Sequence, residues 1–127
     1  KLVAEFFEII VEKDSSDVEA LLPYLDYRGV TIEKSRDEMI DIITFYAHLV
    51  HDSFNITNGE YSIVRHDSVD QKLLERYILQ YDNLENVYYV VRDNDIVTPI
   101  IVENGKIVSF FTGLIQGTKK VHPIPLN

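Results

Sequence analysis

Two histidines in the chain are each followed directly by an aspartate, at His51–Asp52 and at His66–Asp67. A histidine beside a carboxylate is typical of metal centres and catalytic triads, where the acid orients the imidazole ring. Adjacent side chains on a strand point to opposite faces, so His66 and Asp67 are not expected to bind one ion. No His-x-x-x-His spacing accompanies either pair. We therefore interpret both pairs as turns and solvated faces, and we predict no metal site.

Other motifs with a defined chemistry are incomplete or missing. Asp93–Asn94–Asp95 lacks the glycine and the distal glutamate of a calcium loop. The chain has no cysteine, which removes disulfides, thiolate metal sites and thiol nucleophiles together. It also has no glycine-rich phosphate loop and no Gly-x-Ser-x-Gly elbow, and we predict no cofactor. Asn55–Ile56–Thr57 matches the glycosylation triplet, which is a short pattern that arises often by chance.

The length and composition are those of one globular domain, which we expect to span residues 1–127. Apolar residues make up 46% of the chain, and 12 Lys and Arg stand against 21 Asp and Glu, for a net charge of −9. This deficit of cations argues against binding to nucleic acid or to an anionic membrane surface. No signal peptide or membrane span is predicted, which favours the cytoplasm. The chain lacks an initiating Met, so a secreted or lipoprotein-derived fragment stays open.

The first half of the chain has the apolar spacing of helices. A first helix is predicted where Val3, Phe6, Phe7 and Ile10 recur at helical intervals. A second short helix is predicted over 18–25, followed by a break at Arg28–Gly29 and a short strand over 30–33. A third, long helix is predicted from a capping box, with Ser35 at the cap and Glu38 three residues later.

The second half has the pattern of strands. Strands are predicted over 60–65, after the turn Asn58–Gly59, and over 87–91. The clearest signal is a hairpin over 96–103 and 106–115, because Asn104–Gly105 between two β-branched runs is typical of a tight type I′ turn. The tail over 117–127 is expected to be irregular or extended.

The segment 68–81 fits two structures. Its apolar residues fit a helix with Ser68 as the cap, and alternate residues from Leu73 to Tyr81 also fit a strand with one aromatic face. The helical interpretation is favoured on local evidence alone.

The predicted strands are apolar on both faces. Val87, Tyr89 and Val91 oppose Tyr88 and Val90, and in the last strand the set Ile107, Phe111 and Ile115 opposes the set Val108, Phe110 and Leu114. Helices can cover one face, and we expect a second copy of the chain to cover the outer face as a homodimer. The alternative is that the tail or the segment 68–81 covers it.

The order of these elements resembles the NTF2-like superfamily. Two acidic helices are separated by Asp14–Asp17, a capped third helix follows a short strand, and the closing hairpin contains Gly105–Lys106–Ile107, close to a turn typical of that family. The resemblance covers nearly the whole chain. It implies an α+β fold in which three N-terminal helices pack in a curved, mainly antiparallel sheet (NTF2-like or cystatin-like). Such a fold looks like a cone that encloses a pocket.

A second resemblance concerns the segment that begins at Asp95. The run Thr98–Pro99 before a strand, with Gly105 and Gly113 after it, looks like the second half of a thioredoxin-like domain, in which the Thr-Pro bond is cis. Without Cys-x-x-Cys such a domain is redox-inactive. We keep this α/β fold as the alternative.

The NTF2-like resemblance implies a set of candidate site residues. Ketosteroid isomerases and dehydratases of this superfamily use a carboxylate or histidine base together with a tyrosine or protonated aspartate as oxyanion donor. The candidate bases are Asp26, His48 and His51, and the candidate donors are Tyr46, Tyr77 and Tyr89. The first helix has Phe6 and Phe7 where the isomerases usually have a tyrosine, which weighs against isomerase chemistry.

We therefore expect an NTF2-like module that holds a small apolar or aromatic ligand, or contacts a protein, through its cone. The predicted ligand-binding residues are Tyr46, Tyr77, Tyr89 and Asp26. One alternative is an acid–base isomerase or dehydratase of the same fold, which a carboxylate within reach of a buried tyrosine would favour. The other is a redox-inactive thioredoxin-like interaction domain.

Overall fold

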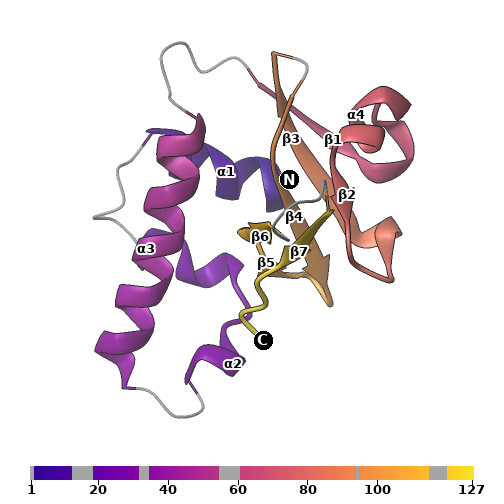
Figure 1. The fold of residues 1–127 in the computed structure, drawn as a ribbon. Helices are drawn as coiled ribbons and strands as arrows, with labels where there is room; N and C mark the ends of the chain where they lie inside the picture. Colours follow the sequence, from indigo (N-terminus) through magenta and orange to yellow (C-terminus); the bar gives the residue numbers. More distant parts are fainter. Residues whose placement is uncertain (1, 13–18, 32–34, 55–60, 94, 115–119) are drawn as a thin grey trace.

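The computed structural model describes residues 2–12, 19–31, 35–54, 61–93, 95–114 and 120–127 (Figure 1). Helix α1 (Leu2–Glu12) has an apolar stripe of four buried residues, Val3, Phe6, Phe7 and Ile10, as its spacing predicts. The predicted caps at Asp14–Asp17, the turn at Asn58–Gly59 and the triplet Asn55–Thr57 lie outside the described residues.

Helix α3 (Arg36–Phe54) begins at the predicted capping box. The Ser35 hydroxyl accepts from the Glu38 N–H at 3.2 Å, and Glu38 Oε1 accepts from the Ser35 N–H at 3.2 Å. The other end of α3 is tied to α1, because His51 Nδ1 donates to the Ile10 carbonyl at 2.8 Å. Both helices lie on the same side of the sheet (Figure 1).

Between these helices the structure differs from the prediction. In place of a helix over 18–25 there is a short 3₁₀ helix, η2 (Leu22–Tyr24), because Pro23 has no N–H to donate to a longer helix. Helix α2 (Arg28–Thr31) takes the place of the predicted break and of the first two residues of the predicted strand, and the rest of that strand lies outside the described residues. A Cβ on Gly29 would overlap the main-chain carbonyl of Asn127, so glycine allows the C-terminus to pack there.

The main sheet has four antiparallel strands in the order β1-β3-β4-β5. They are β1 (Ser62–Arg65), β3 (Val87–Arg92), β4 (Asp95–Glu103) and β5 (Lys106–Ser109). The predicted hairpin is confirmed, since Glu103 pairs with Lys106 and both turn residues have positive φ, 53° at Asn104 and 77° at Gly105.

A second, three-stranded sheet has the order β2-β7-β6. Strand β6 (Thr112–Leu114) pairs antiparallel with β7 (Lys120–Pro123), and β7 pairs parallel with β2 (Ile78–Leu79). The predicted irregular or extended tail thus contains a paired strand. The mainly antiparallel α+β class is confirmed, although the strands form two sheets rather than one.

The ambiguous segment 68–81 contains both predicted structures in succession. A 3₁₀ turn, η3 (His66–Ser68), leads to helix α4 (Gln71–Arg76), which ends before β2. The cap of α4 is Asp70 rather than Ser68, because its carboxylate accepts from the Lys72 N–H at 2.9 Å. A further 3₁₀ turn, η4 (Leu84–Asn86), precedes β3.

The predicted strand over 106–115 is interrupted at Phe110–Phe111. The Thr98 hydroxyl donates to the Phe110 carbonyl at 2.9 Å, and the Ile124 N–H donates to the Phe111 carbonyl at 2.9 Å. The interruption changes the side-chain alternation, so Phe110 lies in the same buried cluster as Ile107. The prediction that these two residues face opposite ways is therefore wrong.

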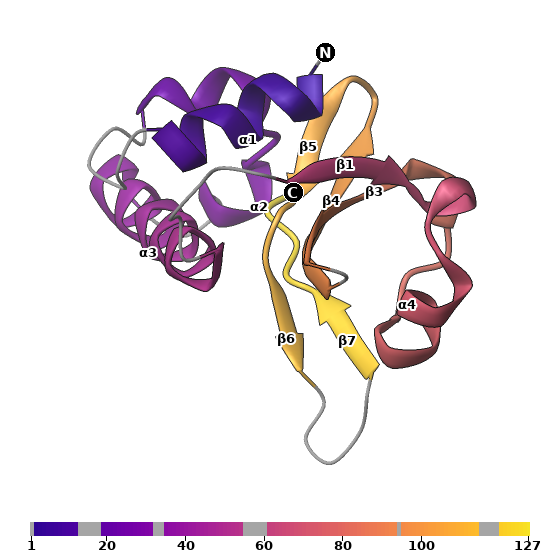
Figure 2. The ribbon, with the colours of Figure 1, turned by 90° about the horizontal axis from the view of Figure 1, so that it is seen from above.

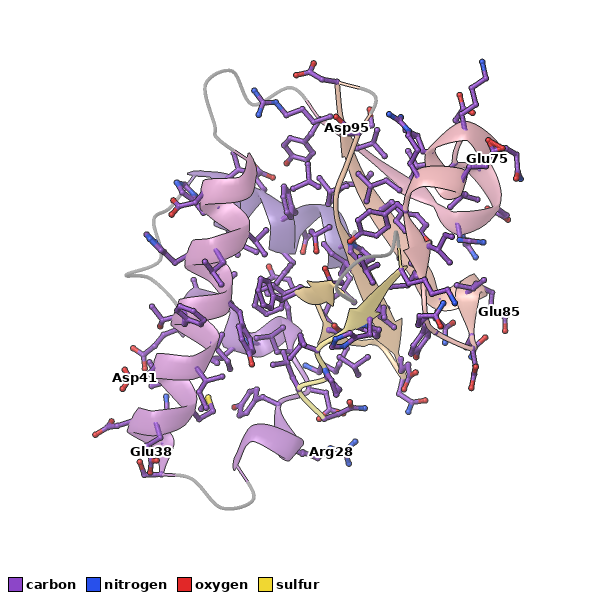
Figure 3. The ribbon with its side chains drawn as sticks, in the orientation of Figure 1. Arg28, Glu38, Asp41, Glu75, Glu85 and Asp95 are labelled. Carbon is purple, nitrogen blue, oxygen red and sulfur yellow. The ribbon has the colours of Figure 1, made fainter. Side chains whose placement is uncertain are left out.

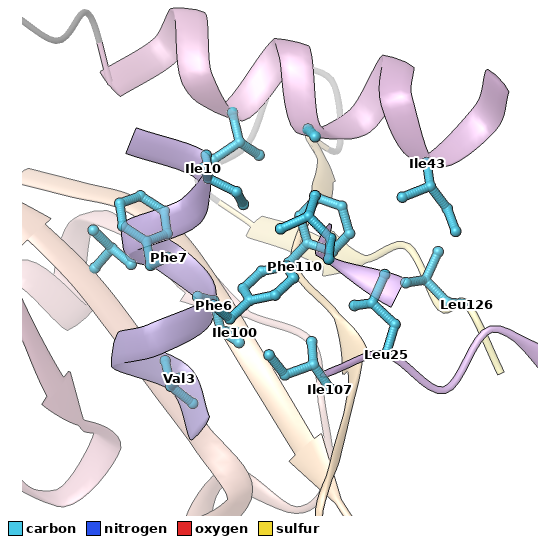
Figure 4. Close-up of a cluster of buried hydrophobic side chains, with 14 of the residues drawn as sticks. Val3, Phe6, Phe7, Ile10, Leu25, Ile43, Ile100, Ile107, Phe110 and Leu126 are labelled. Carbon is cyan, nitrogen blue, oxygen red and sulfur yellow. The ribbon is translucent and has the colours of Figure 1, made fainter. Parts of the chain in front are cut away.

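Two apolar clusters cover the two faces of the main sheet, as the two-sided pattern of β3 predicts. The helix-side cluster lies between the sheet and helices α1 and α3 and includes Phe6, Val90, Ile107 and Phe110 (Figure 4). The far-side cluster includes Val87, Tyr89 and Val108, together with residues of α4, β2 and β7. Figure 2 shows α4 and β7 on the side of the main sheet opposite α1 and α3.

The outer face is thus covered by the chain itself, which was the alternative to a homodimer. The segment containing α4 and β2, together with the tail strand β7, buries the residues that we expected a second copy to cover. The physical argument for a dimer through this face therefore no longer holds. Phe110, which the predicted alternation grouped with Val108, is not on this face. It is 1% exposed and packs edge-to-face on Phe6 on the helix side, with ring centroids 5.2 Å apart.

Two features of the described residues differ from the thioredoxin-like alternative. No cis peptide bond occurs among them, so Thr98–Pro99 is trans, and the four-stranded sheet that contains this bond is wholly antiparallel. The α+β class therefore stands, and the finer NTF2-like assignment stays a prediction.

Candidate functional site

Two of the predicted site residues, Tyr77 and Tyr89, meet in the far-side cluster. Their rings are edge-to-face with centroids 6.4 Å apart. The Tyr89 hydroxyl lies 3.0 Å from Nδ1 of His66, and the Tyr77 hydroxyl lies 3.3 Å from the Thr112 hydroxyl. Strand β3 places Tyr89 at the centre of this cluster, where it is 0% exposed. Each tyrosine hydroxyl thus has its own hydrogen-bond partner, and the two tyrosines contact each other through their rings.

The buried tyrosines stay protonated at neutral pH. Burial raises the pKa of Tyr89 to about 12, and the nearby Tyr77 hydroxyl adds to this shift. Burial also raises the pKa of Tyr77, against a smaller lowering by its hydrogen bond to Thr112. Among the described residues, no hydrogen bond joins either hydroxyl to a carboxylate. The pair can act as neutral hydrogen-bond donors, and it lacks the carboxylate base that acid–base chemistry requires.

The other two predicted ligand-binding residues lie elsewhere. Tyr46, on α3, stacks on Phe111 with ring centroids 4.9 Å apart, on the helix side of the sheet. Asp26 lies before α2, where its carboxylate accepts from Arg28 Nε at 2.8 Å and from Nη2 at 2.7 Å. Figure 3 marks Arg28 at this end of the molecule. The structure does not bring the four predicted residues into one pocket.

The candidate bases are occupied by structural contacts. The hydrogen bond from the Arg28 side chain lowers the pKa of Asp26, which makes this carboxylate a weaker base. His48 Nε2 lies 3.1 Å from an Asp52 carboxylate oxygen on the exposed side of α3. His51 holds α3 to α1. No group of three or more metal-binding side chains occurs in the part of the chain that the structure describes.

An apolar hollow that the sequence did not predict lies between α1 and the main sheet. Its volume is about 430 Å³, and it is lined by Leu2 and Val3 from the first turn of α1, Tyr88 from β3 and Val102 from β4. The Arg65 guanidinium carbon lies 5.7 Å from the centre of the Tyr88 ring. The one sequence signal for this site is the alternation along β3, which places Tyr88 and Tyr89 on opposite faces of the sheet.

Two further hollows are polar and more open. One, of about 380 Å³, is lined by Gln80, Tyr81, Asp82, Asn83 and Glu103, and the Tyr81 hydroxyl donates to Glu103 Oε2. The other, of about 280 Å³, lies at the turn between β3 and β4 and includes Arg92 and Asp93. Sequence reasoning missed the contact between Tyr81 and Glu103, because the two residues are 22 positions apart.

No known family model, curated protein or solved structure matches the chain. Within the described residues, no helix combines the length and the apolar character that crossing a membrane requires. A function for the candidate site therefore has to be inferred from the geometry of the site.

Proposed function

We propose that this chain is a binding module for a small apolar or aromatic ligand, and that the ligand occupies the apolar hollow between α1 and the main sheet. The observation that carries the proposal is the lining: three aliphatic residues and Tyr88 line a hollow of about 430 Å³. Ligand sites in proteins have volumes of roughly 300 to 1,000 Å³ and mostly apolar walls. The hollow is within this range.

The hollow is better suited to a ligand than the residues predicted from the sequence. Tyr77 and Tyr89 are packed inside the far-side cluster, and Tyr46 is stacked on Phe111, so these rings already have protein partners. Tyr88, in contrast, is half-buried and lines open volume. An NTF2-like relationship remains part of the proposal, supported by the α+β class and by the packing of helices α1 and α3 on one side of an antiparallel sheet. The pocket would then lie at the edge of the cone.

The test uses the neutral dye N-phenyl-1-naphthylamine, whose fluorescence increases in apolar surroundings. We expect saturable binding to the purified chain. Val102→Phe would fill the hollow and weaken binding at least about tenfold, which corresponds to about 1.4 kcal/mol. Val64→Phe is the matched control, because Val64 is a half-buried valine on β1 that packs on the far-side cluster. Equal binding by the native chain and the Val102→Phe variant, with both folded by circular dichroism, would refute the proposed site.

A second candidate function, acid–base isomerisation or dehydration, is favoured by one observation. Tyr81 and Glu103 place a hydroxyl and a carboxylate in hydrogen-bond contact at the open hollow of about 380 Å³. The carboxylate is the type of group that removes a proton, and the hydroxyl the type that stabilises an oxyanion. Isomerisation of a β,γ-unsaturated ketone, followed by the absorbance of the conjugated product, tests this function. Turnover that Glu103→Gln does not reduce would count against it.

A further inference from the structure

Arg65 differs from the other arginines of the chain, all of which lie in the described residues. Arg28, Arg36, Arg76 and Arg92 each have a carboxylate oxygen within 4.0 Å, from Asp26, Glu19, Asp95 and Asp93 respectively. Figure 3 marks Asp95, the partner of Arg76. Among the described side chains, the guanidinium of Arg65 has only the ring of Tyr88 as a partner, in a cation–π contact. Its hydrogen-bond donors remain available for a bound group.

The absence of a carboxylate partner is informative in this chain. With 21 Asp and Glu against 12 Lys and Arg, acidic groups are abundant. Guanidinium groups bind carboxylates in a planar, two-pronged geometry, which makes arginine the usual residue for anion recognition. The net charge of −9 also repels anions at long range, so an anion would need a local cation in order to bind.

Arg65 and the apolar hollow are on the same face of the main sheet. Arg65 on β1 is the direct cross-strand partner of Tyr88 on β3, and directly opposite residues of an antiparallel pair project from the same face. Tyr88 contacts the helix-side cluster and lines the hollow. The Arg65 guanidinium carbon lies 5.7 Å from the centre of the Tyr88 ring, so the wall of the hollow formed by Tyr88 has a cation beside it.

We infer that the ligand of this hollow is an amphipathic anion: its apolar part packs against Tyr88, Leu2 and Val102, and its carboxylate or sulfonate is bound by Arg65. The inference rests on the proposed function, because it specifies the chemical class of the ligand for the same site. The proposed ligand is a small free molecule, since the volume of about 430 Å³ is typical of small-molecule sites.

The test compares two dyes with the same aromatic skeleton. 1-Anilinonaphthalene-8-sulfonate carries a sulfonate, and N-phenyl-1-naphthylamine has none. We expect Arg65→Gln to weaken binding of the sulfonated dye about tenfold and that of the neutral dye less than about twofold. Arg65→Lys keeps the charge without the two-pronged geometry and is expected to weaken the sulfonated dye by an intermediate factor. Arg76→Gln is the matched control, since it removes an exposed arginine that is already paired with Asp95.

The outcomes separate this inference from the proposed function. If Arg65→Gln weakens both dyes equally, or neither, while Val102→Phe weakens both, the hollow binds ligands and the anion-binding role of Arg65 is wrong. An equal effect of Arg65→Gln and Arg76→Gln on the sulfonated dye would also overturn that role, because it indicates general charge attraction. If Val102→Phe affects neither dye, the proposed function and this inference both fail.

Discussion

Replacing Tyr89 by phenylalanine is expected to destabilise the protein at neutral pH and to stabilise it at alkaline pH. Tyr89 is 0% exposed, and its hydroxyl lies 3.0 Å from His66 Nδ1. At neutral pH, Tyr89→Phe removes this hydrogen bond, and we expect the free energy of unfolding to fall by about 1 kcal/mol. The ring remains in place, so no cavity forms and the cost stays small.

Alkaline pH changes the sign of the effect. The folded chain holds the Tyr89 proton with a pKa of about 12, whereas the unfolded chain loses it near the ordinary tyrosine value of about 10. Below about pH 10 Tyr89 is protonated in both the folded and the unfolded chain, so the contribution of its hydroxyl to stability is fully present. Between about pH 10 and 12 the unfolded state ionises first, which lowers the free energy of unfolding of the native chain by up to about 3 kcal/mol. The Tyr89→Phe variant has no hydroxyl at this position to ionise, so its free energy of unfolding does not fall for this reason.

The two stability curves are therefore expected to cross at about pH 11, above which the variant is the more stable protein. Urea unfolding followed by circular dichroism, repeated at half-unit intervals of pH, measures both curves. All other ionisable groups are common to the two proteins, so the difference between the curves reports on the Tyr89 hydroxyl. A difference that stays constant through this pH range would refute the assignment of Tyr89 as a buried, protonated hydroxyl.

Two further predictions test the core and the long helix. Phe110→Ala removes a ring that is 1% exposed and packs on Phe6 at 5.2 Å, and urea unfolding should show a loss of about 3 to 5 kcal/mol. A loss below about 1 kcal/mol would contradict the burial of Phe110. Ser35→Ala removes the hydroxyl that accepts from the Glu38 N–H, and the thermal midpoint should fall by an amount equivalent to about 1 kcal/mol. An unchanged midpoint would mean that the capping box does not stabilise α3.

Local signals in the sequence predicted those elements whose cause is local. The capping box at Ser35 and Glu38 predicted the start of α3, because both hydrogen bonds are made within four residues. Asn104–Gly105 predicted the hairpin, because these residues tolerate the positive φ that a type I′ turn requires. The alternation over Val87–Val91 predicted the two faces of β3, since the period of a strand is fixed by its pleat.

Elements that depend on distant partners were predicted less well. The interruption at Phe110–Phe111 depends on hydrogen bonds from Thr98 and Ile124, which local alternation does not reveal. Helix α2 was predicted as a break and a strand because Gly29 was interpreted locally. In the structure this glycine permits the close approach of Asn127, which is a contact with the far end of the chain. The predicted site was divided for the same reason: Tyr77 and Tyr89 meet, whereas Tyr46 and Asp26 pack against other partners.

The sequence by itself determined the α+β class, the long capped helix, the tight hairpin and the presence of two apolar faces on the central strands. Only the tertiary structure decided what covers those faces, because the alternation along β3 and β4 does not identify the segments, α4, β2 and β7, that pack on them. It also decided where open volume remains, beside Tyr88 rather than beside Tyr89. Side-chain periodicity specifies which residues turn inward, but packing between separate segments determines where open volume remains beside them.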